Sequence, residues 1–375
     1  MRVIIVGGGI GGLAAGIALR RHGHEVQVWE RTASIGAAGS GLTLWPNGLR
    51  ALDAIGLGDP VRAKAMMDTE GGIRDRSGRL LTRTDTAKMA ARHGSVVAVH
   101  RADLFDILSD ALGSDRLRLG ATVTGIDIGG EVCVQSDVGA DTADVVVGAD
   151  GLRSIVRTAV CPHAREPRYA GYTAWRMITR PLPPLREGGE IWGRGERFGV
   201  VPLPDGRVYL FGVAGAPEGM RSPDGELTEV RRRFGEWPDP VPQLLDEVPP
   251  DAVLRHDIYD LPDLPSFVRG PVALLGDAAH AMTPNLGQGA NQALEDAVTL
   301  AAVLDGPEVE TSLRRYDSLR RPRTRALTHR SRLIGSVAQW SWPPAVLARD
   351  TGLRLMPGWA MLRSFDSAVG WSPPD

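Results

Sequence analysis

The first thirty residues follow the hydrophobic and polar pattern of a strand, a helix and a second strand. Residues 2–6 read Arg-Val-Ile-Ile-Val, an almost continuous apolar run of the kind found in buried parallel strands. A glycine-rich turn occupies 7–12 and a helix is predicted over 13–21. A second strand covers 25–29 and ends at Glu30. This order predicts a complete βαβ unit at the start of the chain.

Segments with the same two patterns occur much further along the chain. The spacing of apolar residues predicts helices over 47–55 and 101–112. Buried strands are predicted over 144–148 and 272–276, the last of them more than two hundred residues beyond the first strand. A domain built on these strands is therefore discontinuous in the sequence.

Residues 166–264 have a different character. Alternating polar and apolar positions at 172–176 and 206–211 predict an antiparallel sheet with one half-exposed face. We interpret this region as a separate lobe inserted into the first domain. From Gln288 onward the pattern predicts helices, including an arginine-rich helix around 313–334.

Composition narrows the class of protein. The 375 residues carry 43 Lys and Arg against 45 Asp and Glu, a balance that does not favour nucleic-acid binding. Cys133 and Cys161 form no CxxC pair, so neither a disulfide framework nor a cysteine-based zinc site is expected. No apolar run approaches the roughly 18 residues of a membrane span, and the N-terminus is too short for a signal segment. We expect a cytoplasmic monomer or homodimer without metal, nucleic acid or stable membrane insertion.

The opening glycines fit the pattern G-x-G-x-x-G. Gly7 permits the tight turn, Gly9 lets a diphosphate approach the backbone, and Gly12 allows the helix to pack closely on the strand. The helix N-terminus offers N–H groups to the phosphates. Glu30, 18 residues after Gly12, is placed to bind ribose hydroxyls, which disfavours a 2′-phosphate. The alternative is a glycine turn without a ligand.

Two later segments distinguish FAD from NAD. Residues 147–157 contain Asp150-Gly151, and residues 275–297 contain Gly-Asp-Ala-Ala-His followed by Gly-Gln-Gly. Together with the opening glycines, they resemble the three fingerprints of the single-component (group A) FAD-dependent aromatic monooxygenases. That family includes the p-hydroxybenzoate, salicylate and urate hydroxylases. The resemblance runs from residue 1 to about residue 330.

The resemblance implies an α/β fold with three parts. These are an FAD-binding Rossmann-like domain of the glutathione-reductase type, an inserted antiparallel-sheet substrate lobe and a helical C-terminus. The FAD-binding domain is predicted to comprise 1–73, 96–165 and 265–335, the substrate lobe 74–95 and 166–264, and the C-terminal segment 336–375.

The second of these segments also has a physical interpretation. Asp277 follows a buried strand, at the edge where parallel sheets bind ligands, and its carboxylate suits a polyol such as the ribityl chain. The alternative is an aspartate that caps the next turn. Residues 287–289 open a helix whose N-terminal amides would face the flavin and stabilise its reduced, anionic form. Pro284 would stiffen the wall on which the flavin rests.

Further cofactor contacts are carried over from the resemblance. Arg101 matches an arginine that contacts the phosphate or ribityl region, the alternative being a salt bridge with Asp103 or a neighbouring acid. Arg31, Thr43 and Val123 fit secondary contacts, and Asp150-Gly151 matches a motif shared by FAD and nicotinamide binding. The predicted cofactor residues are Gly7, Gly9, Gly12, Glu30, Arg31, Thr43, Arg101, Val123, Asp150, Asp277, Gly287, Gln288, Gly289, Ala290 and Asn291.

The implied reaction is a hydroxylation. The chain has no second G-x-G-x-x-G, so NADH or NADPH would dock transiently as a co-substrate. The reduced FAD would react with O2, and a flavin C4a-hydroperoxide would transfer one oxygen atom to a small aromatic or polycyclic phenol. No side-chain nucleophile is required. Two alternatives remain open: an FAD-dependent dehydrogenase or reductase on the same fold, and a non-catalytic FAD-binding subunit.

Candidate substrate contacts lie in the inserted lobe and beside Pro284. Arg197 and Tyr209, twelve residues apart, resemble in spacing an arginine and a tyrosine that hold the substrate of urate hydroxylase. An arginine can anchor an anion with two hydrogen bonds, and a tyrosine can interact with a phenolic proton. The alternative for both is ordinary sheet surface. Asn285 stands where urate hydroxylase has an aspartate, which argues against urate.

Other polar and aromatic features favour structural roles. We expect His280 to pack near the flavin, and adjacent His256 and Asp257 to point to opposite faces of a strand. The arginines of 313–334 are expected to face solvent or a second copy. The tail contains four tryptophans that either pack over the substrate lobe or meet a membrane or partner: Trp340, Trp342, Trp359 and Trp371.

Overall fold

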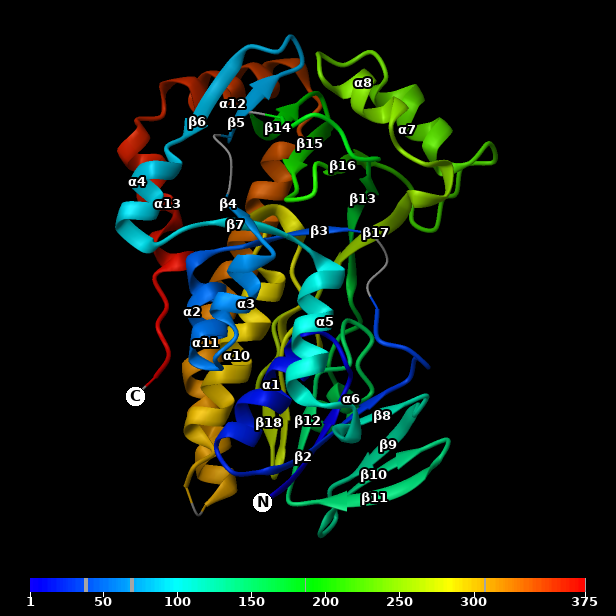
Figure 1. The fold of residues 1–375 in the computed structure, drawn as a ribbon, viewed down its shortest axis with the longest axis vertical. Coiled ribbons are helices and arrows are strands. Elements are labelled where there is room, and N and C mark those ends of the chain that lie inside the picture. The colour runs from blue at the N-terminus through cyan, green and yellow to red at the C-terminus, as the bar shows by residue number, and fades with distance from the viewer. Residues whose placement is uncertain (37–39, 68–70, 186, 307, 375) are drawn as a thin grey trace.

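The computed structural model describes the chain except for residues 37–39, 68–70, 186, 307 and 375. Two large sheets lie toward opposite ends of an elongated molecule, and long helices run along one side of it (Figure 1). This arrangement confirms the predicted α/β class, with a second, mainly antiparallel sheet and a helical C-terminus.

The first sheet has six strands in the order β18-β19-β12-β1-β2-β8. Five of them are parallel, and the edge strand β18 is antiparallel. Val3, Ile4 and Ile5 are fully buried, as expected of the apolar run at the start of the chain. The four strands predicted from the apolar runs are confirmed. The bounds are β1 Arg2–Val6, β2 Glu25–Glu30, β8 Leu117–Leu119, β12 Val145–Gly148, β18 Val268–Arg269 and β19 Val272–Leu274.

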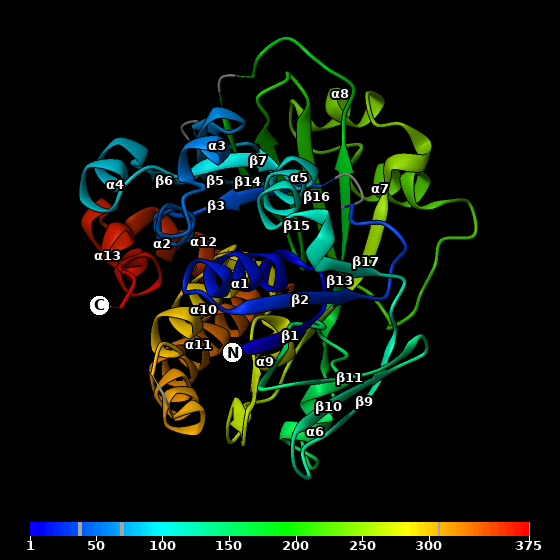
Figure 2. The ribbon, with the colours of Figure 1, turned by 60° about the horizontal axis from the view of Figure 1, so that its bottom comes forward.

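Three helices pack beside this sheet. Helix α1 (Ile10–Arg21) begins three residues earlier than predicted, because Gly9 is extended and forms its N-cap. Gly11 lets α1 approach α10 (Gly289–Val303) closely, and α5 (Arg101–Leu112), which has the predicted bounds, also packs on α1. Figure 2 shows α1 lying over β1 and β2 with α10 beside it.

The second sheet has seven strands in the order β17-β13-β16-β15-β14-β5-β6. It is antiparallel except where β14 pairs with β5, and it confirms the predicted alternating stretches. One face carries an aromatic cluster, including Trp175, Phe198 and Phe234, that α7 and α8 cover. The bounds are β5 Gly71–Asp75, β6 Leu80–Thr84, β13 Arg168–Ile178, β14 Gly188–Trp192, β15 Glu196–Pro202, β16 Val208–Gly215, β17 Leu254–Asp260, α7 Glu226–Phe234 and α8 Val241–Asp246. The division into domains by residue range remains a prediction.

Two three-stranded sheets, β11-β10-β9 and β3-β7-β4, complete the strand framework. The first of them lies at the same end of the molecule as the N-terminus (Figure 1). The remaining elements are β3 Gly41–Leu44, β4 Met66–Met67, β7 Val97–His100, β9 Val123–Asp127, β10 Val132–Ser136, β11 Gly139–Ala143, α2 Pro46–Ala54, α3 Gly58–Ala63, α4 Thr86–His93, α6 Val156–Val160, α9 Asp277–His280 and short 3₁₀ turns at Ser114–Arg116, Pro250–Ala252 and Pro284–Leu286.

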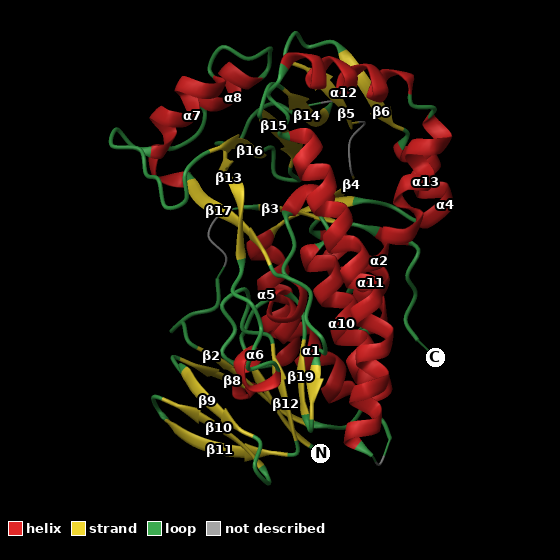
Figure 3. Ribbon diagram, turned by 180° about the vertical axis from the view of Figure 1, so that it is seen from behind, coloured by secondary structure: helices red, strands yellow, loops and turns green. Residues whose placement is uncertain are grey.

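The arginine-rich helix is α11 (Val309–Ala338), which lies beside α10 (Figure 3). The expectation that its arginines face solvent or a second copy is wrong for Arg320, which is 1% exposed. The Arg320 guanidinium lies 2.5 Å from Glu295 and 2.6 Å from Asp296, both on α10. Arg323 also donates hydrogen bonds to Glu295. Buried charges therefore join α11 to α10.

The predicted helical tail consists of α12 (Pro343–Leu355) and α13 (Gly358–Val369). Helix α12 lies against β6, as expected of a tail that packs on the substrate lobe. Trp371 packs against the main core, but Trp342 is 68% exposed and Trp359 63% exposed. Among the described residues, no helix combines the length and apolar character needed to cross a bilayer.

Candidate active site

Three glycines set the geometry of the turn between β1 and α1. Gly7 has a left-handed φ of +110°, and a side chain there would collide with the Ala149 carbonyl. A side chain at Gly12 would collide with the Gly7 carbonyl oxygen. At Gly9, by contrast, an added Cβ would meet no atom of the described residues within 4 Å. Gly9 therefore faces open space at the N-terminus of α1, where a diphosphate can approach the backbone.

Glu30 ends β2 beside this turn. Its Oε2 accepts a hydrogen bond from the Gly8 N–H at 2.7 Å, and its Oε1 accepts from the Thr32 N–H and hydroxyl, both at 3.0 Å. The carboxylate is thus fixed against the glycine turn, where a ribose bound next to the diphosphate would lie. The neighbouring Arg31 is exposed.

Asp150 and Asp277 follow neighbouring parallel strands, but their carboxylates have different surroundings. Asp150 accepts hydrogen bonds from the Ser154 hydroxyl at 2.5 Å and the Ile155 N–H at 2.7 Å. Its carboxylate thereby caps the start of α6. Burial raises the pKa of the Asp150 carboxyl in spite of these bonds. Asp277 is exposed, and within the described chain its carboxylate accepts no hydrogen bond. The structure therefore does not support the capping alternative for Asp277, and this carboxylate is available to a polyol.

The N-terminus of α10 is held by buried side chains that hydrogen-bond to neighbouring segments. Gln288 is the N-cap residue, and its Oε1 accepts a hydrogen bond from Asn47 at 2.9 Å. Asn291 donates to the Thr43 carbonyl at 3.2 Å. An added Cβ at Gly289 would meet no atom within 4 Å. The side chains of Gln288 and Asn291 are thus occupied, whereas the N–H groups of the first turn are left for a ligand.

The turn that leads into α10 is short and rigid. Pro284 opens a 3₁₀ turn, and Gly287 ends it with a left-handed φ of +60°. Ala290 lies half-buried in the first turn of α10. Proline has a fixed φ, so this turn is stiff. That it forms the wall beside the flavin remains a prediction.

Arg101 is not paired with Asp103, so that alternative is wrong. Asp103 instead lies 3.8 Å from Lys64. Burial and the nearby Arg176 lower the pKa of Arg101, while Asp277 opposes this effect. In the part of the chain that the structure describes, Arg101 makes no ion pair. An unpaired arginine next to Asp277 suits a ligand with negative charge or many hydrogen-bond acceptors.

The two other predicted cofactor contacts lie in strands. Val123 is buried at the start of β9, and Thr43 is half-buried in β3. Contacts of these residues and of Arg31 with a cofactor remain predictions.

One face of the seven-stranded sheet carries polar side chains from five strands, β13 to β17. Residues two apart along a strand point to the same face. The register pairs Tyr209 with Val201 and Phe211 with Arg176. These side chains therefore lie on the face of the sheet that is turned away from the aromatic cluster under α7 and α8. We call this surface the polar sheet face. Its polar side chains include Tyr172, Arg176, Glu190, Arg197, Tyr209 and His256.

Arg197 and Tyr209 share this face but are separated along it. Tyr209 lies opposite Val201, four residues beyond Arg197, which corresponds to about 13 Å along the strand. Burial raises the pKa of the Tyr209 phenol, although Arg176 and Arg101 oppose the shift. Such a pair can hold two ends of one ligand.

Arg197 is 3% exposed, so ordinary sheet surface is the wrong interpretation of this residue. Its Nη2 donates a hydrogen bond to Asn285 Oδ1, and its Nη1 lies 3.6 Å from Glu190 Oε2. Its Nε is buried and has no acceptor among the described residues. Asn285 is fixed in turn, because its Nδ2 donates to the Tyr172 hydroxyl at 3.0 Å. The unpaired Nε is a donor available to a ligand.

Sequence analysis missed Arg176 and considered His256 only as part of a dyad. The structure confirms that His256 and Asp257 point to opposite faces, since Asp257 lies 2.9 Å from Arg255 on the side of the aromatic cluster. Burial, Arg176 and Arg101 lower the pKa of His256, so its imidazole is neutral near pH 7. The alternation within 172–176 predicted that Arg176 lies on one face of a strand. It did not predict which face of the sheet meets the cofactor.

A buried ionic network lies directly behind Asp277. Asp296 Oδ2 accepts hydrogen bonds from the Gly276 N–H at 2.8 Å and from His280 Nε2 at 2.5 Å. Although burial opposes it, His280 and Arg320 hold the pKa of Asp296 well below its usual range. His280 is thus buried, as expected, but as the partner of a carboxylate. The network fixes the backbone that carries Asp277.

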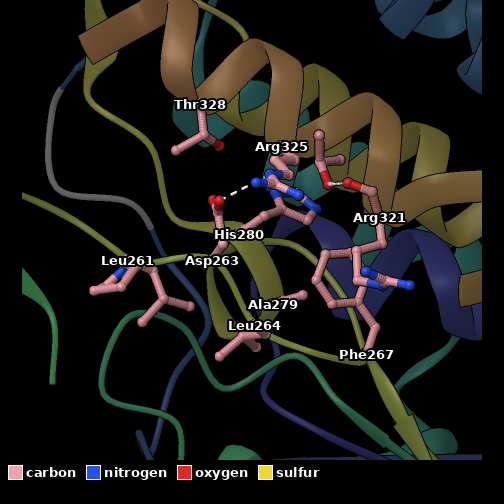
Figure 4. Close-up of a pocket in the computed structure, with 11 residues that line it drawn as sticks. Leu261, Asp263, Leu264, Phe267, Ala279, His280, Arg321, Arg325 and Thr328 are labelled. Carbon is pink, nitrogen blue, oxygen red and sulfur yellow. Dashed lines mark hydrogen bonds and ion pairs between the residues drawn. The ribbon is translucent and has the colours of Figure 1, made fainter. Parts of the chain in front are cut away.

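A cavity beside His280 is too small to hold a substrate. Its volume is about 20 Å³, space for about one water molecule. Figure 4 shows His280 in its wall, with Asp263 and Arg325 joined by an ion pair of 2.8 Å. The polar sheet face is therefore the better candidate for the substrate site.

The fold and the site together define an FAD-binding flavoprotein. The residues present fit FAD, because Gly9 and Gly289 leave space at two helix N-termini and the Asp277 carboxylate is without a partner among the described residues. Residues 1–331 match the family model described as FAD binding domain, and the chain belongs to that family.

Individual relatives match most of its length. The chain is 39% identical over 362 residues to aurachin C monooxygenase/isomerase of Stigmatella aurantiaca, covering 95% of this chain and 94% of that protein. It is 34% identical to FAD-dependent urate hydroxylase of Klebsiella pneumoniae subsp. pneumoniae, covering 88% and 89%. Klebsiella pneumoniae HpxO complexed with FAD and uric acid has a TM-score of 0.93 and 30% identity, covering 100% and 97%. The chain is an FAD-dependent monooxygenase, as predicted.

Proposed function

We propose that this monooxygenase hydroxylates a small aromatic or polycyclic phenol-like substrate at the expense of NADH or NADPH and O2. One observation carries the proposal. Arg101 and Arg176 lie near each other and near Tyr209, and neither arginine has an ion pair within the described residues. Two unpaired guanidinium groups favour an electron-rich oxygen such as that of a phenolate.

The chain's own residues position the reactants. FAD, when bound, supplies the oxidation of NAD(P)H and the activation of O2. The N–H groups at the start of α10 stabilise negative charge at the flavin edge. Arg197 Nε donates a hydrogen bond to the substrate. The raised pKa of Tyr209 keeps its hydroxyl protonated near neutral pH, so it too acts as a donor.

Asn285 restricts the chemistry that the site can perform. Its amide is fixed by the Tyr172 hydroxyl at 3.0 Å, the Thr283 hydroxyl at 2.8 Å and the Ser331 carbonyl at 2.9 Å. An amide cannot remove a proton, so the site favours a hydroxyl that loses its proton to solvent, with the arginines of the site stabilising the resulting phenolate. This supports a phenol-like compound and argues against urate.

The test is oxidation of NADH and NADPH by the FAD-loaded protein, measured with O2 uptake, in the presence of a panel of phenols. Stimulation by a phenol, with a product that has gained one oxygen atom, is the expected result. A product that has lost two hydrogen atoms would instead identify a dehydrogenase. Bound FAD without any oxidation of NAD(P)H would indicate a non-catalytic subunit.

A further inference from the structure

Large apolar side chains are exposed along α12 and at the start of α13. Leu355 is 76% exposed and Leu347 67%, and these two residues, eight positions apart, lie on one side of α12. Trp342 precedes the helix, while Met356 and Trp359 follow it. We call these five residues the C-terminal patch. Large apolar side chains exposed on neighbouring elements are typical of interaction surfaces.

The surroundings of the C-terminal patch are basic, although the whole chain is slightly acidic. Arg354 lies 2.6 Å from Asp75, and Arg92 lies 2.5 Å from Asp366, so residues 74–93 adjoin the C-terminal helices. Figure 1 shows α12, α13, α4 and β6 together at one end of the molecule. Residues 74–93 and 340–369 together contain nine Lys and Arg against four Asp and Glu, whereas the whole chain contains 43 against 45.

A surface hollow beside the patch combines the two properties. It has a volume of about 400 Å³ and is lined by Arg92, Trp359, Leu362 and Arg363. The Arg363 guanidinium lies 5.4 Å from the centre of the Trp359 ring. In the described part of the chain, Arg363 has no carboxylate partner. Arg92 is already paired with Asp366, but the Arg363 guanidinium beside the Trp359 ring suits a phosphate that carries a hydrocarbon chain.

We propose that this end of the molecule docks onto an anionic lipid bilayer. The C-terminal patch would enter the interfacial layer, where tryptophan and arginine side chains are favoured, and Arg363 would bind a lipid phosphate. A second copy fits this surface less well, because a two-fold contact would bring the same basic surface against itself. The contact is peripheral, and it does not depend on the substrate proposed above.

Flotation of the FAD-loaded full-length protein with vesicles tests this proposal. Phosphatidylcholine vesicles with and without phosphatidylglycerol are compared. We expect binding to the anionic vesicles, weakened about fivefold by Arg363→Gln and abolished by the double substitution Leu355→Ser and Trp359→Ser. Val138→Ser is the matched control, since Val138 is 52% exposed between β10 and β11, at the opposite end of the molecule.

Each other outcome overturns the proposal. These are no flotation of the unaltered protein, equal binding to both kinds of vesicle, or an equal loss in Val138→Ser. Sedimentation of the same variants addresses a second copy: if the double substitution dissociates a dimer and vesicles are not bound, the surface joins two copies. Bound FAD and NAD(P)H oxidation should be unchanged in all variants, which separates a docking defect from misfolding.

Discussion

An added methyl group has different consequences at Gly9 and at Gly12, because protein atoms occupy the space beside Gly12 but not the space beside Gly9. Gly9 has φ −72° and ψ 177°, which any residue adopts, and it faces open space. We expect Gly9→Ala to fold normally but to bind FAD on the order of tenfold more weakly, since the methyl group occupies the approach of the diphosphate. FAD titration and thermal unfolding measure the two effects.

Gly12→Ala serves as the comparison. Its methyl group would meet the Gly7 carbonyl oxygen, so we expect a lower melting temperature even before FAD is added. Unchanged FAD affinity in Gly9→Ala would contradict the assignment of the diphosphate to this turn.

Arg197 is the second residue with a clear prediction. Its buried Nε has no acceptor, so a substrate acceptor would complete its hydrogen bonding. We expect Arg197→Ala to raise the KM for the substrate about ten- to hundredfold, the range for hydrogen bonds to charged groups. Steady-state kinetics at constant FAD content, with a phenol that stimulates NAD(P)H oxidation, measure this change. Unaltered substrate affinity would show that Arg197 only joins β15 to Asn285.

At the scale of elements, α10 and α11 depend on one buried guanidinium. Arg320→Met would leave Glu295 and Asp296 without their main cation, and we expect a loss of about 3–5 kcal/mol in the free energy of unfolding. Urea denaturation measures the loss. Arg314→Met on the same helix is the control, because its ion pair with Glu310 is exposed and should contribute at most about 0.5 kcal/mol. Similar values for both variants would contradict the structural role of Arg320.

Helix α7 provides a prediction about pH. Hydrogen bonds from Arg232 and Arg233 lower the pKa of Glu229 to about 2. A carboxyl whose pKa is lower in the folded state than in the unfolded state stabilises the fold at any pH above its unfolded-state pKa. This stability is lost as the pH falls through the folded-state pKa. Glu229→Gln should therefore reduce the free energy of unfolding at pH 7, and the difference should disappear between about pH 5 and pH 2.

The exposed Glu310 supplies the comparison for this experiment. Glu310→Gln, measured by urea denaturation over the same pH range, should change the free energy of unfolding little. A difference for Glu229→Gln that is constant with pH would show that the arginines do not hold its charge.

At the scale of the whole molecule, the cofactor cradle joins segments that lie far apart in the sequence. The open space at Gly9, the Asp277 carboxylate and the N-terminus of α10 all border it. Removal of FAD should therefore lower the melting temperature. Free FAD at about one hundred times its Kd should raise the free energy of unfolding by about 2.7 kcal/mol. Thermal unfolding with and without FAD measures this. Equal melting temperatures would contradict a cradle formed from these segments.

Local sequence patterns predicted the strands and helices well. Features that depend on contacts between distant segments could not be predicted from these patterns. The apolar runs and the glycine turn predicted the strands of the first sheet, because each signal lies within a few residues. The burial of Arg320 depends on acids of another helix, so the arginine-rich pattern alone placed it wrongly in solvent. Arg176 joins the candidate site through the pairing of β13 with β16, which its own strand does not encode.

The position of β19 in the first sheet has a consequence for synthesis of the protein. This strand pairs with β12 in the sheet that begins with β1, yet it follows β1 by more than 260 residues. A chain that leaves the ribosome therefore presents its glycine turn long before α9 and α10 exist to face it. Fragments that end before residue 272 contain Gly7, Gly9 and Gly12 but no complete FAD cradle. Retention of FAD by the purified chain thus distinguishes chains that extend through α10 from shorter fragments.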